Sequence, residues 1–84
     1  MEKIIELKSV ELIGLLGVGD EHIKLIESNI PVSISARGEK LTIKGKSSSI
    51  KKAGSILKEM RETLSSKGSL FADDVNSLIK LSKT

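Results

Sequence analysis

The period of the apolar positions changes several times along this 84-residue chain, and each change predicts a new element. Apolar residues between charged ones predict a short strand over residues 2–8 with one buried face. Ser9 can cap a short helix at about Val10–Leu16, and Gly17 can adopt the positive φ that ends it. Gly14 weakens this helix by up to about 1 kcal/mol relative to Ala, so close packing must support it.

A second helix is predicted directly after a glycine-rich break at residues 17–19, the most flexible point of the chain. Asp20 is a favourable N-cap, and its carboxylate suits the positive end of the helix dipole. The helix covers about Glu21–Asn29 and places apolar residues three and four positions apart on one face. It ends before Pro31, because proline disfavours helical geometry in the residue that precedes it.

From Val32 onward the apolar period changes to two. Alternating apolar and polar residues at positions 32–37 and 41–45 flank the segment Gly38-Glu39-Lys40. This pattern predicts a β-hairpin whose outer face is polar.

The remaining residues are predicted to be helical. Ser47, Ser48 and Ser49 can cap a long helix. Its apolar stripe consists of Ile50, Ala53, Leu57, Met60 and Leu64. A break at residues 67–69 precedes a last helix that starts near Ala72, with two aspartates in its favourable first turn. The apolar face of that helix is expected to consist of Phe71, Val75, Leu78 and Ile79.

This element order and the length predict one α+β domain over residues 1–84. The absence of Cys excludes disulfides, thiolate metal sites and cysteine nucleophiles, and fits a reducing compartment. No stretch approaches the roughly 20 apolar residues that span a bilayer, and the first residues do not form a signal peptide. We therefore expect a soluble cytoplasmic protein without a membrane partner.

The formal net charge of +3 hides an uneven distribution. Residues 1–30 carry three Lys against six acids, whereas residues 31–84 carry eleven Lys or Arg against five acids. The basic part suits a polyanionic partner. Solvated lysines on a helix and a hairpin explain the same distribution without any partner.

No residue set supports catalysis. His22 is the single histidine, lies beside Glu21 on a first helical turn, and is expected to be a solvated surface side chain. Asp73 and Asp74 are neighbours on a helix, where consecutive side chains point about 100° apart, so they form a poor acid/base pair. Residues 17–19 lack the Lys-Ser/Thr that completes a phosphate-binding P-loop. We expect no enzyme activity, metal or cofactor in these residues.

Two helices joined by a glycine-containing loop, then a hairpin and a long helix, resemble the KH module, which clamps about four nucleotides of a single strand with a G-x-x-G loop. More specifically, the chain resembles the N-terminal KH-like domain of the PhoH-like, phosphate-starvation-inducible family. The similarity rests on five motifs: Leu16-Gly17-Val18-Gly19-Asp20-Glu21-His22-Ile23, Ala36-Arg37-Gly38, Leu41-Thr42-Ile43-Lys44-Gly45, Lys67-Gly68 and Asp74-Val75. The resemblance implies a KH-like fold of type I order βααββα. It has a three-stranded antiparallel sheet covered on one face by helices, and here an extra C-terminal helix.

The resemblance also implies a function and partners. Family members continue into a P-loop ATPase domain, so the chain is expected to be a fragment of a longer protein. That parent protein is expected to bind ATP and Mg, and oligomerisation is possible through it. Its own expected role is weak binding of single-stranded RNA, beside the ATPase domain of the same polypeptide. The expected contact residues are Gly17, Val18, Gly19, Lys24, Arg37, Lys40 and Lys44.

One position departs from the KH pattern, because Asp20 stands where the last glycine of the loop belongs. A carboxylate about 5 Å from a phosphate repels it by roughly 3 kcal/mol at an effective dielectric constant of about 20. As a helix N-cap, Asp20 needs no ligand. The alternative function is therefore a protein-interaction or oligomerisation module that docks on the ATPase core and has lost nucleic-acid binding.

Overall fold

The structure is a computed structural model that describes residues 1–82, with the side chains of Ser9, Val10 and Val18 left outside the description. Strands and helices follow one another in the order expected from the periodicity. The elements are β1 (Glu2–Glu6), α1 (Ser9–Leu16), the single 3-10 turn η1 (Val18–Asp20), α2 (Glu21–Asn29), β2 (Val32–Arg37), β3 (Lys40–Gly45), α3 (Ser47–Lys67) and α4 (Ala72–Ser82).

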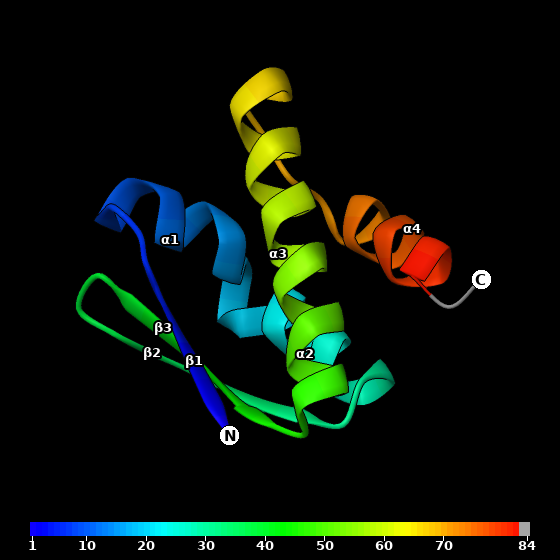
Figure 1. The fold of residues 1–84 in the computed structure, drawn as a ribbon. Coiled ribbons are helices and arrows are strands. Elements are labelled where there is room, and N and C mark those ends of the chain that lie inside the picture. The colour runs from blue at the N-terminus through cyan, green and yellow to red at the C-terminus, as the bar shows by residue number, and fades with distance from the viewer. Residues whose placement is uncertain (83–84) are drawn as a thin grey trace.

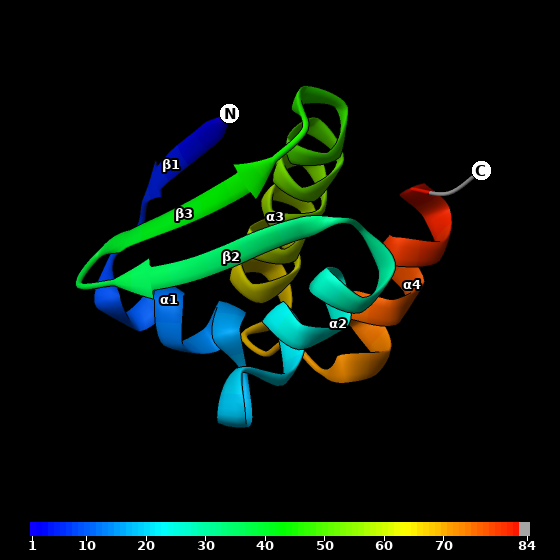
Figure 2. The same cartoon turned by 90° about the horizontal axis from the view of Figure 1, so that it is seen from below.

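The three strands form one antiparallel sheet in the order β1-β3-β2, with β1 and β2 at its edges. Helices cover one face of this sheet, with the long α3 crossing it (Figure 1), and the other face is left open, as the view from below shows (Figure 2). The α+β class and the three-stranded antiparallel sheet covered on one face are thus confirmed.

The core lies between the sheet and the helices. Its largest fully buried side chains come from the four α-helices and from β3: Leu15, Ile26, Leu41, Ile43, Leu57, Met60, Val75 and Ile79. Gly14 of α1 faces α3, since a Cβ on it would lie 2.7 Å from Leu64 Cδ2. The glycine that weakens α1 therefore permits the close approach of α3, as the sequence suggested.

Serine capping of α1 and α3 is wrong. α1 already includes Ser9, α3 already includes Ser47, and the N-cap residues are Lys8 and Lys46, neither of which makes a side-chain capping bond. Both lysines adopt extended backbone angles, φ −69° and ψ 150°, so the helices start one residue earlier than serine capping requires.

The apolar faces of the two C-terminal helices are predicted only in part. Ile56 of α3 is buried although the expected stripe omits it. Phe71 was expected in the core but is 62% exposed. Phe71 lies before Ala72, the first residue of α4, so the helical spacing used to place it on the apolar face does not apply to it.

Candidate nucleic-acid interface

The α1–α2 loop, residues Gly17–Asp20, holds three residues with positive φ: Gly17 (75°), Gly19 (61°) and Asp20 (59°). Gly17 closes α1, because its N–H donates to Ile13 O at 3.3 Å. Its ψ of 178° combined with positive φ is a conformation open essentially to glycine alone. No atom outside the local chain lies within 4 Å of a Cβ built on Gly19, so a ligand can approach the backbone there.

His22 lies beneath this loop and not on the surface, so the expectation of a solvated histidine is wrong. It is 3% exposed, and its Nδ1 donates to Leu15 O at 3.0 Å. A Cβ on Gly17 would meet the imidazole ring at 3.0 Å. The missing side chain of Gly17 therefore makes the space that the ring fills, and the ring ties the start of α2 to the end of α1.

Contrary to the expectation from the sequence, the Asp20 side chain does not cap α2. Asp20 occupies the N-cap position, but its backbone is left-handed, with φ 59° and ψ 27°, and its side chain makes no capping hydrogen bond. The left-handed region costs an L-residue roughly 1–2 kcal/mol, although Asp tolerates it better than most. Asp20 therefore keeps the backbone shape of a glycine while adding an exposed carboxylate to the loop.

The edge strand β2 runs beside α2, and a side chain of α2 occupies part of that edge. The Ile34 N–H donates to Glu27 Oε2 at 2.8 Å. Sequence reasoning missed this contact, which joins residues seven positions apart on two different elements. Lys24, one of the expected contacts, lies on the same helix and is exposed.

The basic residues of the hairpin occupy a different place from the loop. Arg37 and Lys40 are cross-strand partners, and Lys44 follows on the same outer face of the sheet, because Leu41 and Ile43 point into the core. Arg37 and Lys40 also line a depression at the end of the hairpin, whose charged lining is mixed and further includes Lys8, Arg61, Glu6, Glu11 and Glu39. The structure therefore groups the hairpin residues on the open face and not at the α1–α2 loop, and the end of the hairpin shares its depression with Glu11 of α1.

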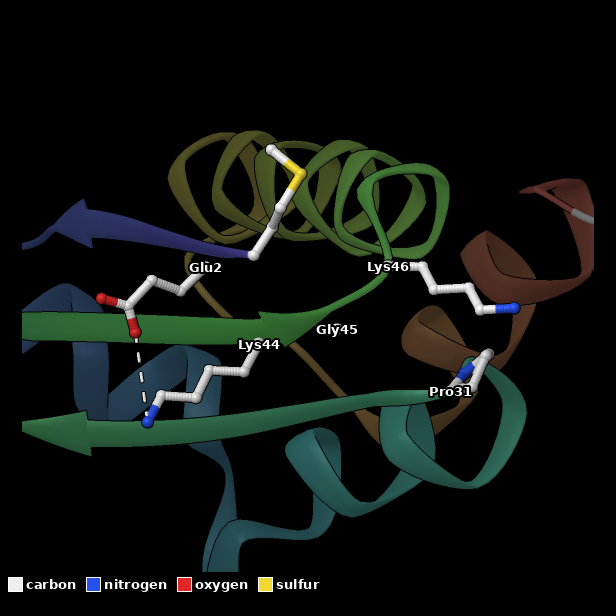
Figure 3. Close-up of a pocket in the computed structure, with 6 residues that line it drawn as sticks. Glu2, Pro31, Lys44, Gly45 and Lys46 are labelled. Atoms are coloured by element: carbon white, nitrogen blue, oxygen red, sulfur yellow. Dashed lines mark ion pairs between the residues drawn. The ribbon is translucent and has the colours of Figure 1, made fainter.

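Several of these basic groups already have acidic neighbours. Arg61 donates from Nε and Nη2 to Glu11 Oε2 at 3.2 and 3.0 Å. Lys44 Nζ lies 4.0 Å from Glu2 Oε2, an exposed pair that salt screens readily. A second depression, at the other end of β3, is lined by Met1, Glu2, Pro31, Lys44, Gly45 and Lys46. Figure 3 shows that Lys44 turns toward Glu2 there, whereas Lys46 extends past Pro31.

The expected contacts thus divide into two groups. Gly17, Gly19 and Lys24 belong to the loop and α2, whereas Arg37, Lys40 and Lys44 belong to the open face of the sheet. The Val18 side chain lies outside the description.

Within residues 1–82, no three His, Cys, Asp or Glu side chains come together as a metal site, and no helix is long and apolar enough to cross a membrane. The carboxylate of Asp74 accepts two hydrogen bonds at the junction of α3 and α4. The Phe71 N–H, first, and then the Lys67 ammonium lower the pKa of its carboxyl.

Comparison with models of known families, with curated proteins and with solved structures found no match to this chain.

Proposed function

We propose that this chain is a non-catalytic, KH-like accessory domain that binds single-stranded RNA weakly and with little sequence preference. The observation that carries the proposal is the α1–α2 loop, in which Gly17 and Gly19 leave the backbone open ahead of the α2 N-terminus. The α+β sheet with two consecutive helices inserted after β1 agrees with the element order of the KH module.

The loop would hold phosphate by backbone contact. The first N–H groups of α2 have no partners within the helix and lie at the positive end of its dipole, which favours an anion. Lys24, one turn further along α2, adds an exposed cation.

The basic hairpin would extend this contact without forming part of the same groove. Arg37 and Lys40 lie at the hairpin end of the open face of the sheet. An RNA chain that extends beyond the loop would be attracted there by charge alone. Such contacts add affinity that depends on salt and carries no sequence information.

The wider assignment rests on the five sequence motifs. We propose that the chain belongs to a longer PhoH-like cytoplasmic protein whose P-loop ATPase domain binds ATP and Mg. None of residues 1–82 is assigned a role in binding either.

A second candidate function, docking on a protein such as that ATPase core, is favoured by the acidic groups around the loop. Asp20 and Glu21 are exposed where phosphate would approach, and Glu27 already occupies the Ile34 N–H on the β2 edge. All three oppose a polyanion.

Titration of fluorescently labelled single-stranded RNA into the 84-residue chain tests the first function. Two or three phosphate contacts predict that raising salt from about 50 to 200 mM weakens binding roughly tenfold. Gly19→Asp should weaken binding about fivefold or more, because it places a second carboxylate at the loop, and it should keep the fold at a cost of about 1 kcal/mol, since its side chain enters open space from a left-handed backbone. Gly68→Asp is the matched control, because Gly68 also has positive φ and open surroundings but lies outside the loop. Binding that is undetectable at about 50 mM salt, or equally weak in both variants, would refute the proposal.

A further inference from the structure

Two large apolar side chains are exposed at one depression near the α1–α2 loop. Ile13 is 72% exposed on α1, and Phe71, the one Phe, Trp or Tyr of the chain, is 62% exposed before α4. Together with Leu70 they line one depression of about 430 Å³, which we call the Ile13–Phe71 surface. Large apolar groups gathered in this way on a small soluble domain mark an interaction site more often than isolated ones do.

This surface is held rigidly. The Phe71 N–H donates to Asp74 Oδ2 at 3.0 Å, and the Phe71 carbonyl accepts the N–H groups of Asp74 and Val75 at 3.0 and 3.2 Å. Lys67 Nζ donates to Asp74 Oδ1 at 3.1 Å, which joins the end of α3 to the start of α4. Phe71 is therefore exposed although its backbone is fixed, so binding there would cost little ordering of the chain.

The charges around the surface are acidic. Glu21 lines the depression, and the exposed Asp20 and Asp73 are sequence neighbours of the lining residues Glu21 and Ala72. Within the described chain no Lys or Arg lines it, and the nearby Lys67 is paired with Asp74. An apolar surface with an acidic rim complements a partner that is both apolar and basic, and repels a nucleic acid.

A second copy of this chain fits poorly as the occupant. Its basic helix is α3, and the apolar stripe of α3 is already buried in its own core. The depression is lined by residues of α1, of the start of α2, of the α3–α4 connection and by the first residue of α4, and no strand residue lines it, which favours a helix laid into a groove over an added strand.

We propose that the Ile13–Phe71 surface binds a basic amphipathic helix of another protein or domain. Its apolar residues would cover Ile13 and Phe71, and its Lys or Arg side chains would face Asp20, Glu21 and Asp73. This gives the second candidate function a location, and it holds whether or not the loop binds RNA.

Selection of random 18-residue peptides displayed on phage, with the 84-residue chain as target, tests the proposal. We expect enriched sequences with apolar residues three and four positions apart and a positive net charge. Synthetic copies should lose roughly tenfold in affinity for Ile13→Ser and Phe71→Ser, and several-fold for Glu21→Gln.

Two exposed apolar residues elsewhere supply matched controls. Ile4→Ser changes the open face of the sheet, and Leu81→Ser changes the end of α4, at side chains that are 54% and 69% exposed. Neither should alter peptide affinity, and circular dichroism should show all four serine variants folded. The proposal is overturned if no peptide is enriched, if the selected peptides are acidic, or if the controls weaken binding equally. It is also overturned if sedimentation shows a dimer that Phe71→Ser dissociates, since the occupant is then a second copy. RNA titration of Phe71→Ser should match the wild type. The peptide experiment does not depend on RNA binding, so it can be interpreted even if the chain binds no RNA.

Discussion

Replacing Asp20 by Gly separates the backbone strain at this position from any capping role. Gly removes roughly 1–2 kcal/mol of left-handed strain. It adds about 0.5–1 kcal/mol of backbone entropy to the unfolded chain, and it removes a favourable charge at the α2 N-terminus that contributes about 0.3 kcal/mol. The balance is a stabilisation of about 0.5 kcal/mol, which raises the Tm of a domain of this size by roughly 2–4 °C. A capping aspartate would give the opposite sign.

The same substitution changes the electrostatics of the proposed RNA site. Asp20 is exposed, so the dielectric constant near that of water applies, and its repulsion of a neighbouring phosphate is about 1 kcal/mol. Both Asp20→Gly and Asp20→Asn should therefore bind single-stranded RNA about fivefold more tightly at low salt. Asn retains good tolerance of the left-handed region, so it reports the charge without the entropy of glycine.

Thermal melts by circular dichroism and RNA titration at about 50 mM salt measure the two effects on the same samples. Glu62→Gln on the exposed side of α3 is the control, since it makes the same change in net charge outside the loop. A fall of 3 °C or more in the Tm of Asp20→Gly, by the scaling used above, would refute the strain argument. Equal RNA affinity in Asp20→Asn and the wild type would show that this carboxylate does not face phosphate.

Substitutions at Gly17, Glu27 and Asp74 test three further contacts, and Gly19→Ala and Glu27→Gln serve as comparisons. Gly17→Ala should destabilise the fold by about 3 kcal/mol in urea unfolding, because its Cβ meets His22 at 3.0 Å in a glycine-only conformation; Gly19→Ala, with open space, should lose only about 1 kcal/mol. Glu27→Ala should cost about 1 kcal/mol by freeing the Ile34 N–H, whereas Glu27→Gln, which keeps an acceptor oxygen, should cost less in the same assay. The folded-state pKa of Asp74 lies below its unfolded value, so its stabilisation is present at neutral pH and is lost as the pH falls through about 4 and below. Acid titration of Asp74→Asn should therefore show a shallower loss of stability than the wild type, and identical acid profiles would contradict this.

The sequence predicts the elements well where a local signal fixes them. The α2 helix at Glu21–Asn29 is confirmed to the residue, since a glycine break precedes it and Pro31 follows it. The hairpin is also confirmed, because the change to period two marks both strands.

The site is predicted less well, because its shape depends on contacts between elements. The burial of His22 depends on the space above Gly17, and the Glu27 bond to Ile34 depends on how α2 lies against β2. Asp is favoured both as an N-cap and in the left-handed region, so its identity could not decide how Asp20 is used.

The two proposed surfaces share one set of charges, which fixes the sign of any coupling between them. Glu21 lines the Ile13–Phe71 surface and Asp20 precedes it in the loop, so both would oppose phosphate at the loop and favour a basic helix beside it. A docked basic helix would neutralise them and remove the repulsion that weakens RNA binding, and by linkage bound RNA would favour the helix to the same degree. His22 lies between the two, in contact with Gly17 and in the lining of the depression, so both ligands would rest on the same rigid support. The acidic groups of the loop would then weaken RNA binding only while no basic partner is bound. The two candidate functions need not exclude each other.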